Sequence, residues 1–121
     1  MKVAISSTGG TTKDSLEPRF GRAAGFIIYD LDQEQYEYLD NTANQQASKG
    51  AGINAAQNVA RAGAKAVISG HVGPKAFDAL RSGQIKVFQS QAKSIEEVIA
   101  DFREGKLPQA EGADSPGHWK G

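Results

Sequence analysis

The sequence contains no cysteine, and it has only one methionine and one tryptophan among its 121 residues. Without cysteine the chain cannot form disulfides, use a thiol as a nucleophile, or hold zinc or an iron-sulfur cluster through thiolates. No apolar run approaches the ~20 residues that cross a bilayer. The first residues, Met1–Ile5, lack the apolar core of a signal peptide. The sequence therefore predicts a cytoplasmic protein without membrane contact.

An excess of charge of either sign is also absent, because 14 basic and 14 acidic residues cancel. Such a chain has no general field to attract nucleic acid, so nucleic acid is not expected as a partner. The length is typical of one domain with one core. We assign residues 1–105 to that domain. Residues 106–121, which include Pro108 and Pro116, are predicted to be a flexible C-terminal tail.

Short apolar runs alternate with glycine-bearing turns along the domain. The predicted strands are residues 3–6, 25–31, 36–39, 66–69 and 85–88. The predicted helices run from about Gly50 to Ala62, from Pro74 to just before Gly83, and from Ser94 to near Gly105. The third helix has the clearest start, because Ser94 and Glu97 have the spacing of a capping box.

The order β-β-β-α-β-α-β-α predicts how these elements pack. The first three strands should form an antiparallel meander, and the later ones should join by right-handed parallel crossovers. We expect an α/β protein with a ribonuclease-H-like three-layer fold, in which helices cover both faces of a mixed five-stranded sheet of order 3-2-1-4-5. Strands one, three, four and five would point the same way, so the loops after them would gather at one edge, where ligands bind in open sheets.

Three segments rich in glycine or hydroxyl groups follow those strands, namely Ser7–Thr12, Ser48–Gly52 and Gly70–Lys75. Two of them run into helix N-termini, where unpaired amide groups favour an anion. The long connection between the first two strands adds two arginines. The candidate ligand-binding residues are Thr8, Gly9, Arg19, Arg22, Lys49, Gly50, Gly52, Gly73 and Lys75, and the candidate metal ligand is His71.

Each candidate also has a structural interpretation. His71 fits a loop histidine that is bonded to backbone, and Arg22 fits a structural ion pair as well as a ligand contact. The glycines that open the first helix could serve close packing against the sheet. Lys49 and Lys75 are typical of solvated surface lysines.

Three motifs, Phe20–Ala23, Gly50–Gly52 and Gly70–Phe77, occur together in this order. With them the chain resembles the dinitrogenase iron-molybdenum cofactor biosynthesis family over about residues 1–104, and it is similar to its small stand-alone members. The family includes nitrogenase accessory factors that bind and deliver the iron-molybdenum cofactor or its iron-sulfur precursor. The resemblance implies the same ribonuclease-H-like fold, an iron-molybdenum or iron-sulfur cluster as ligand, and cluster-assembly proteins as partners.

The leading hypothesis is therefore a non-catalytic binder or carrier of an anionic metal cluster. Because His71 and His118 are the only imidazoles, binding would be transient, shared between subunits, or based on His71 plus backbone dipoles. One alternative is a regulatory or interaction module without a cluster, and His118 and Trp119 in the tail could dock a partner or simply belong to a disordered end. A metal-dependent hydrolase is less favoured, because serines rather than carboxylates end the central strands. We assign no catalytic residues.

Overall fold

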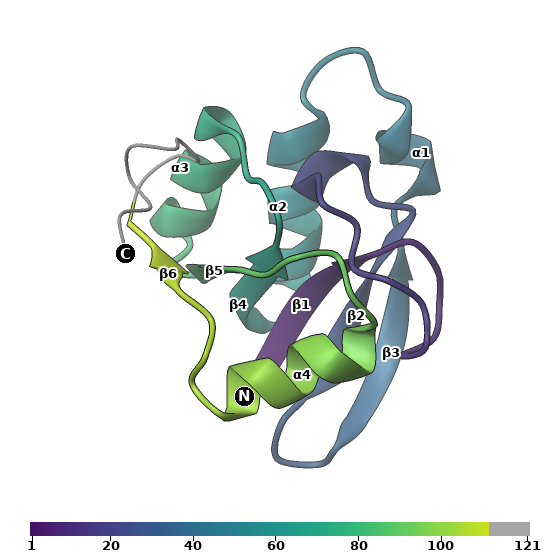
Figure 1. Cartoon of the computed structure of the whole chain (residues 1–121). Coiled ribbons are helices and arrows are strands. Elements are labelled where there is room, and N and C mark those ends of the chain that lie inside the picture. Colours follow the sequence, from purple (N-terminus) through teal and green to yellow (C-terminus); the bar gives the residue numbers. More distant parts are fainter. Residues whose placement is uncertain (112–121) are drawn as a thin grey trace.

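The computed structural model describes residues 1–111 and contains helices and strands in nearly the predicted order. Their bounds are β1 (Lys2–Ser7), the 3-10 turn η1 (Phe20–Arg22), β2 (Gly25–Asp30), β3 (Gln35–Asp40), α1 (Thr42–Gln45), α2 (Ala51–Arg61), β4 (Ala64–Ser69), α3 (Pro74–Ser82), β5 (Lys86–Gln89), α4 (Ile95–Arg103) and β6 (Gln109–Ala110). The two short helical segments η1 and α1 were not predicted (Figure 1).

The strands form one mixed sheet of order β3-β2-β1-β4-β5-β6. The pairs β1–β2 and β2–β3 are antiparallel, whereas β1–β4 and β4–β5 are parallel. The predicted order of the first five strands is therefore confirmed. It follows that β1, β3, β4 and β5 run in one direction, and their carboxyl ends lie at the same edge of the sheet.

The expectation of five strands is wrong, because β6 adds a sixth. It pairs antiparallel with β5, with Val87 opposite Ala110. A strand of two residues is too short to show an alternating pattern, so only its pairing with β5 identifies it. β6 lies within the segment that we predicted as a tail, whereas His118 and Trp119 lie outside the described residues. Among residues 1–111, no helix is long and apolar enough to cross a membrane.

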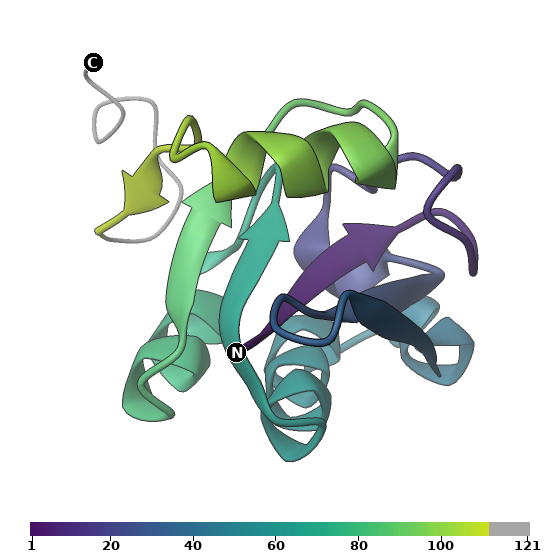
Figure 2. The ribbon, with the colours of Figure 1, turned by 90° about the horizontal axis from the view of Figure 1, so that it is seen from below.

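Helices cover both faces of the sheet, with α4 on one side and α2 and α3 on the other (Figure 2). Successive side chains of β1 point to opposite faces. Ile5 is buried with Ile95 and Val98 of α4, whereas Ala4 is buried in the cluster that includes Val59 of α2. The sheet is thus buried on both sides, and its carboxyl-end edge is the place where loops from both layers meet.

Candidate functional site

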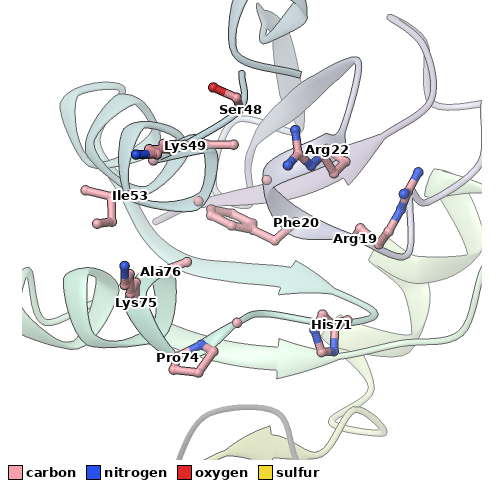
Figure 3. A pocket seen from close by; sticks show the side chains of 15 residues that line it. Arg19, Phe20, Arg22, Ser48, Lys49, Ile53, His71, Pro74, Lys75 and Ala76 are labelled. Atoms are coloured by element: carbon pink, nitrogen blue, oxygen red, sulfur yellow. The ribbon is translucent and has the colours of Figure 1, made fainter. Parts of the chain in front are cut away.

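A pocket of about 480 Å³ lies at the carboxyl-end edge of the sheet, and its lining includes the first residues of α2 and α3. Its walls come from three segments far apart in the sequence, residues 19–22, 48–53 and 71–76 (Figure 3). We call it the α2–α3 pocket. The volume lies within the usual range of small-ligand sites.

Most of the candidate residues from the sequence line this pocket. The ones that do so are Arg19, Arg22, Lys49, Gly50, Gly52, His71, Gly73 and Lys75. Figure 3 shows Lys49 and Lys75 on the side of the two helices and Arg19 and His71 on the opposite side. The other two candidates, Thr8 and Gly9, are not part of its lining.

The two helices begin at the pocket without a side-chain cap. Gly50 has a left-handed φ of 73°. Its carbonyl accepts from Asn54 N at 2.9 Å, so the amides of residues 51–53, which come before Asn54, have no acceptor within the helix. Gly73, which has an extended backbone, starts α3, and its carbonyl likewise accepts from Phe77 N at 2.9 Å. Neither helix has an acidic residue in its first turn. The pocket therefore adjoins two positive helix ends, where an anion is favoured.

Close packing brings these two helix starts together. A Cβ atom built on Gly52 would lie 2.9 Å from the Cβ of Ala76, which no ordinary contact allows. A Cβ on Gly21 would lie 3.0 Å from Gly52 N. Gly52 thus serves close packing, but against α3 and η1 rather than against the sheet as considered from the sequence, and this close approach forms part of the pocket wall. Gly73 differs, because a Cβ there would meet nothing within 4 Å.

The cationic side chains around the pocket are held to different degrees. Arg22 Nη1 donates to the carbonyls of Gln45 at 2.9 Å and Ala47 at 2.8 Å, which ties the segment before α2 to η1. Arg19 Nε lies 3.4 Å from Glu17 Oε2, and its side chain is 67% exposed. Lys49 and Lys75 are exposed. Arg22 therefore has a structural role, bonded to carbonyls rather than in the ion pair considered from the sequence, while the lysines supply local charge.

His71 stands at the end of β4, where the backbone is firmly held. Its carbonyl accepts from Phe20 N at 3.0 Å, and the residue forms a parallel β-bridge with Arg19. One position earlier, a Cβ on Gly70 would lie 2.9 Å from the carbonyl oxygen of Pro18. These contacts fix the backbone of His71, and its exposed side chain reaches the pocket from a rigid base.

The connection after β1 explains why Thr8 and Gly9 stay away from the pocket. The hydroxyl and the amide of Thr8 both lie within hydrogen-bond distance of Ser15 O. The carboxylate of Asp14 accepts from the amide of Thr11 at 2.9 Å and would lie 2.5 Å from a Cβ on Gly9. This glycine-rich turn is thus wrapped around a carboxylate of its own chain.

Sequence reasoning did not select several other residues of the pocket lining, among them Phe20, Ser48, Ile53 and Pro74. Phe20 is 1% exposed and belongs to the core next to the pocket. Ser48 and Pro74 stand within the loops that the sequence brought to the sheet edge, so position in those loops was the available signal. For Phe20 and Ile53, apolar character indicated only a core position.

The ligand chemistry of the described residues is limited. Residues 1–111 contain no group of three or more histidine, cysteine, aspartate or glutamate side chains placed to hold a metal ion. The α2–α3 pocket has one imidazole, that of His71, together with amide and cationic groups. It is therefore suited to hydrogen-bond and neutralise an anion that already carries its own ligands, rather than to build a coordination shell.

Residues 1–105 match the family model described as dinitrogenase iron-molybdenum cofactor. An uncharacterised protein of Methanocaldococcus jannaschii is 32% identical over 114 residues, which cover 92% of each chain. Among solved structures, the apo form of the orange protein from Desulfovibrio gigas is 42% identical, with a TM-score of 0.90 over 94% of this chain and 96% of that one. A candidate NifB protein from Thermotoga is 30% identical, with a TM-score of 0.84 over 95% and 97% of the two chains.

Proposed function

Because this chain belongs to the dinitrogenase iron-molybdenum cofactor family, we propose that it is a non-catalytic binder or carrier of an anionic metal cluster of the iron-molybdenum or iron-sulfur type. The observation that carries the proposal is the α2–α3 pocket, where two uncapped helix starts and the side chains of Lys49, Lys75 and Arg19 surround one cavity. The cluster is the cargo of the protein, and cluster-assembly proteins are its partners.

The physical basis of binding is the charge of the cargo. Unpaired amides of Ala51, Gly52 and Lys75 are donors for the sulfide or other anionic ligands on the outside of a cluster. Nearby ammonium groups lower the energy of a multiply negative guest, most strongly where it is partly withdrawn from water. These contributions are each modest, so the cargo would be held firmly only by their sum.

The lack of cysteine sets a limit on the kind of cargo. The sequence has no thiolates, and among the described residues of the pocket lining His71 is the one imidazole that can bond directly to a metal. A cluster with a complete ligand shell needs no such bond, whereas a cluster with open metal sites would need several. We therefore expect delivery of an intact, ligand-saturated cluster, with His71 as a hydrogen-bond partner or as one added ligand.

Anaerobic reconstitution tests the proposal. The purified protein is incubated with ferrous iron and sulfide, with and without molybdate, and is then desalted; visible absorbance and the iron, molybdenum and sulfide contents are measured. We expect protein-bound colour and metal. A colourless, metal-free product under both conditions would refute cluster binding.

A pair of charge variants locates the bound cluster. The double variant Lys49→Gln with Lys75→Gln should retain about tenfold less cluster, because two nearby charges are each worth about 0.3–1 kcal/mol or more in a partly buried site. The matched control is Lys65→Gln with Lys86→Gln. These exposed lysines lie at the amino ends of β4 and β5, whereas the pocket lies at the carboxyl-end edge of the sheet. Equal losses in the two double variants would place binding elsewhere. His71→Ala, analysed in parallel, separates a metal bond from charge alone.

A further inference from the structure

A second cavity, of about 680 Å³, opens at the same sheet edge but beside the carboxyl ends of β4 and β5 and the segment that follows α4. We call it the β4–β5 pocket. Its lining includes Pro18, His71, Lys93, Asp101, Lys106 and Leu107. The carboxyl ends of parallel strands are the usual place for ligands in open α/β sheets. The function proposed above makes no use of this cavity.

A short wall of backbone separates the two pockets. The bridge between Arg19 and His71 and the close approach of Pro18 to Gly70 form this wall. Arg19 lines the α2–α3 pocket, whereas Pro18 and Gly70 line the β4–β5 pocket. Among the described residues, His71 alone is therefore part of the lining of both pockets.

Two ammonium groups line the β4–β5 pocket, and each is positioned by a carboxylate. Lys93 Nζ donates to Asp101 Oδ2 at 2.8 Å, and Lys106 Nζ lies 2.9 Å from Glu104 Oε1. A lysine ammonium has three N–H donors, so one bond to a carboxylate orients the group without using all of its donors. Both amino groups are thus held near the cavity.

These two cations are close enough to affect each other. The hydrogen bond to Asp101 raises the pKa of Lys93, while the charge of Lys106 acts in the opposite direction on it. The pKa of Lys106 is likewise raised, chiefly by its hydrogen bond to Glu104. The carboxylate of Asp101, which also lines the pocket, raises the pKa of both lysines, so both groups remain charged at neutral pH.

The rest of the lining suits a small carbon skeleton. Pro18, Leu107 and Pro108 offer apolar surface, and Ser90 and Gln91 add polar groups. We propose that the β4–β5 pocket binds a small organic acid with two carboxylates, which pair with Lys93 and Lys106 while the carbon chain lies against the prolines and Leu107. This site is separate from the α2–α3 pocket, so it stands or falls independently of cluster binding.

Titration of the metal-free, ¹⁵N-labelled full chain with succinate, followed by two-dimensional NMR, tests the inference. We expect saturable shifts at Ser90, Gln91 and Leu107, and much weaker binding of the neutral diamide succinamide. Lys106→Gln should weaken succinate binding about tenfold, as expected for loss of one charged hydrogen bond. Its matched control, Lys65→Gln, should bind as the wild type does.

Three results would overturn the inference. One is the absence of saturable shifts at millimolar succinate, and another is equal binding of succinate and succinamide. The third is a set of shifts centred on Lys49 and Lys75, which would assign the acid to the α2–α3 pocket. None of them bears on whether a cluster is retained after anaerobic reconstitution, so the two proposals can fail separately.

Discussion

Helix α4 supplies its own cap, whereas α2 and α3 begin at glycines that have no side chain to do so. At α4, Ser94 Oγ accepts from Glu97 N at 3.2 Å, and Glu97 Oε1 accepts from Ser94 N at 3.1 Å. Glu96 and Glu97 also place negative charge in the first turn. Within residues 1–111, no side-chain cap is found at the start of α2 or α3, and neither helix has an acidic residue in its first turn.

The difference shows that the first-turn amides of a helix can be bonded within the protein or left available to a ligand. All three helices have amides without an acceptor in the first turn. In α4 these amides donate to acceptors of the protein itself, so the bonds at the helix start stabilise the fold. In α2 and α3 they are left to solvent or to a guest, and lysines rather than glutamates stand beside them. A cluster in the α2–α3 pocket would accept from first-turn amides, as Asp14 O, Thr12 O and Ser94 Oγ do at α4.

The largest effect is expected from closing the space between α2 and α3. Gly52→Val would force a branched side chain against Ala76, where even a Cβ would lie at 2.9 Å. We expect a loss of about 1–3 kcal/mol of unfolding free energy, typical of overpacking, together with loss of cluster retention. Denaturant unfolding and metal analysis measure the two. Gly73→Ala is the control, since its Cβ has open space; an unchanged unfolding midpoint in Gly52→Val would contradict the packing argument.

The next effect comes from giving α3 the kind of start that α4 has. Gly73 has φ −69° and ψ 170°, which suit a capping residue. In Gly73→Asp the new carboxylate would accept from the first-turn amides and repel an anionic guest. We expect helix stability to rise by a few tenths of a kcal/mol and cluster retention to fall about tenfold.

The neutral variant Gly73→Asn separates capping from charge in this experiment. It can cap the helix but adds no negative charge, so it should reduce cluster retention less than Gly73→Asp does. Thermal unfolding and metal content after reconstitution are the measurements. Full cluster retention in Gly73→Asp would show that the start of α3 takes no part in binding.

The smallest effect on cluster retention is expected from removing the cap of α4. Ser94→Ala breaks the capping box and should cost about 1 kcal/mol of unfolding free energy. It should leave cluster retention unchanged, because Ser94 does not line the α2–α3 pocket. Denaturant unfolding tests the first expectation and metal content the second. If Ser94→Ala also lowered the amount of cluster retained, the start of α4 could not be distinguished from the starts of α2 and α3 in its effect on binding.

Local signals in the sequence were sufficient for most elements of the fold. The spacing of Ser94 and Glu97 predicted the capping box, and apolar runs located the first five strands. These features depend on residues within a few positions of one another, so they can be seen without a structure. The short elements η1, α1 and β6 escaped prediction because each is stabilised by contacts to distant segments, as Arg22 is bonded to Gln45 and Ala47.

The candidate site was predictable in part. The three loops rich in glycine or hydroxyl groups could be assigned to one sheet edge from strand direction, and the two that run into helix starts line the α2–α3 pocket. The first glycine-rich loop misled, because its composition does not show that Thr11 binds the carboxylate of Asp14. Nor does composition show that Arg22 is bonded to backbone carbonyls, which only the path of the chain determines.

By itself the sequence determined the kinds of element, the lack of thiolate ligands, and the glycines that leave two helix starts uncapped. Only the tertiary structure decided that those starts face one cavity and that His71 stands between two. The reason is that a helix start is specified by adjacent residues, whereas a cavity depends on how closely distant segments approach. Here that approach is set by contacts such as Gly52 against Ala76 and Pro18 against Gly70.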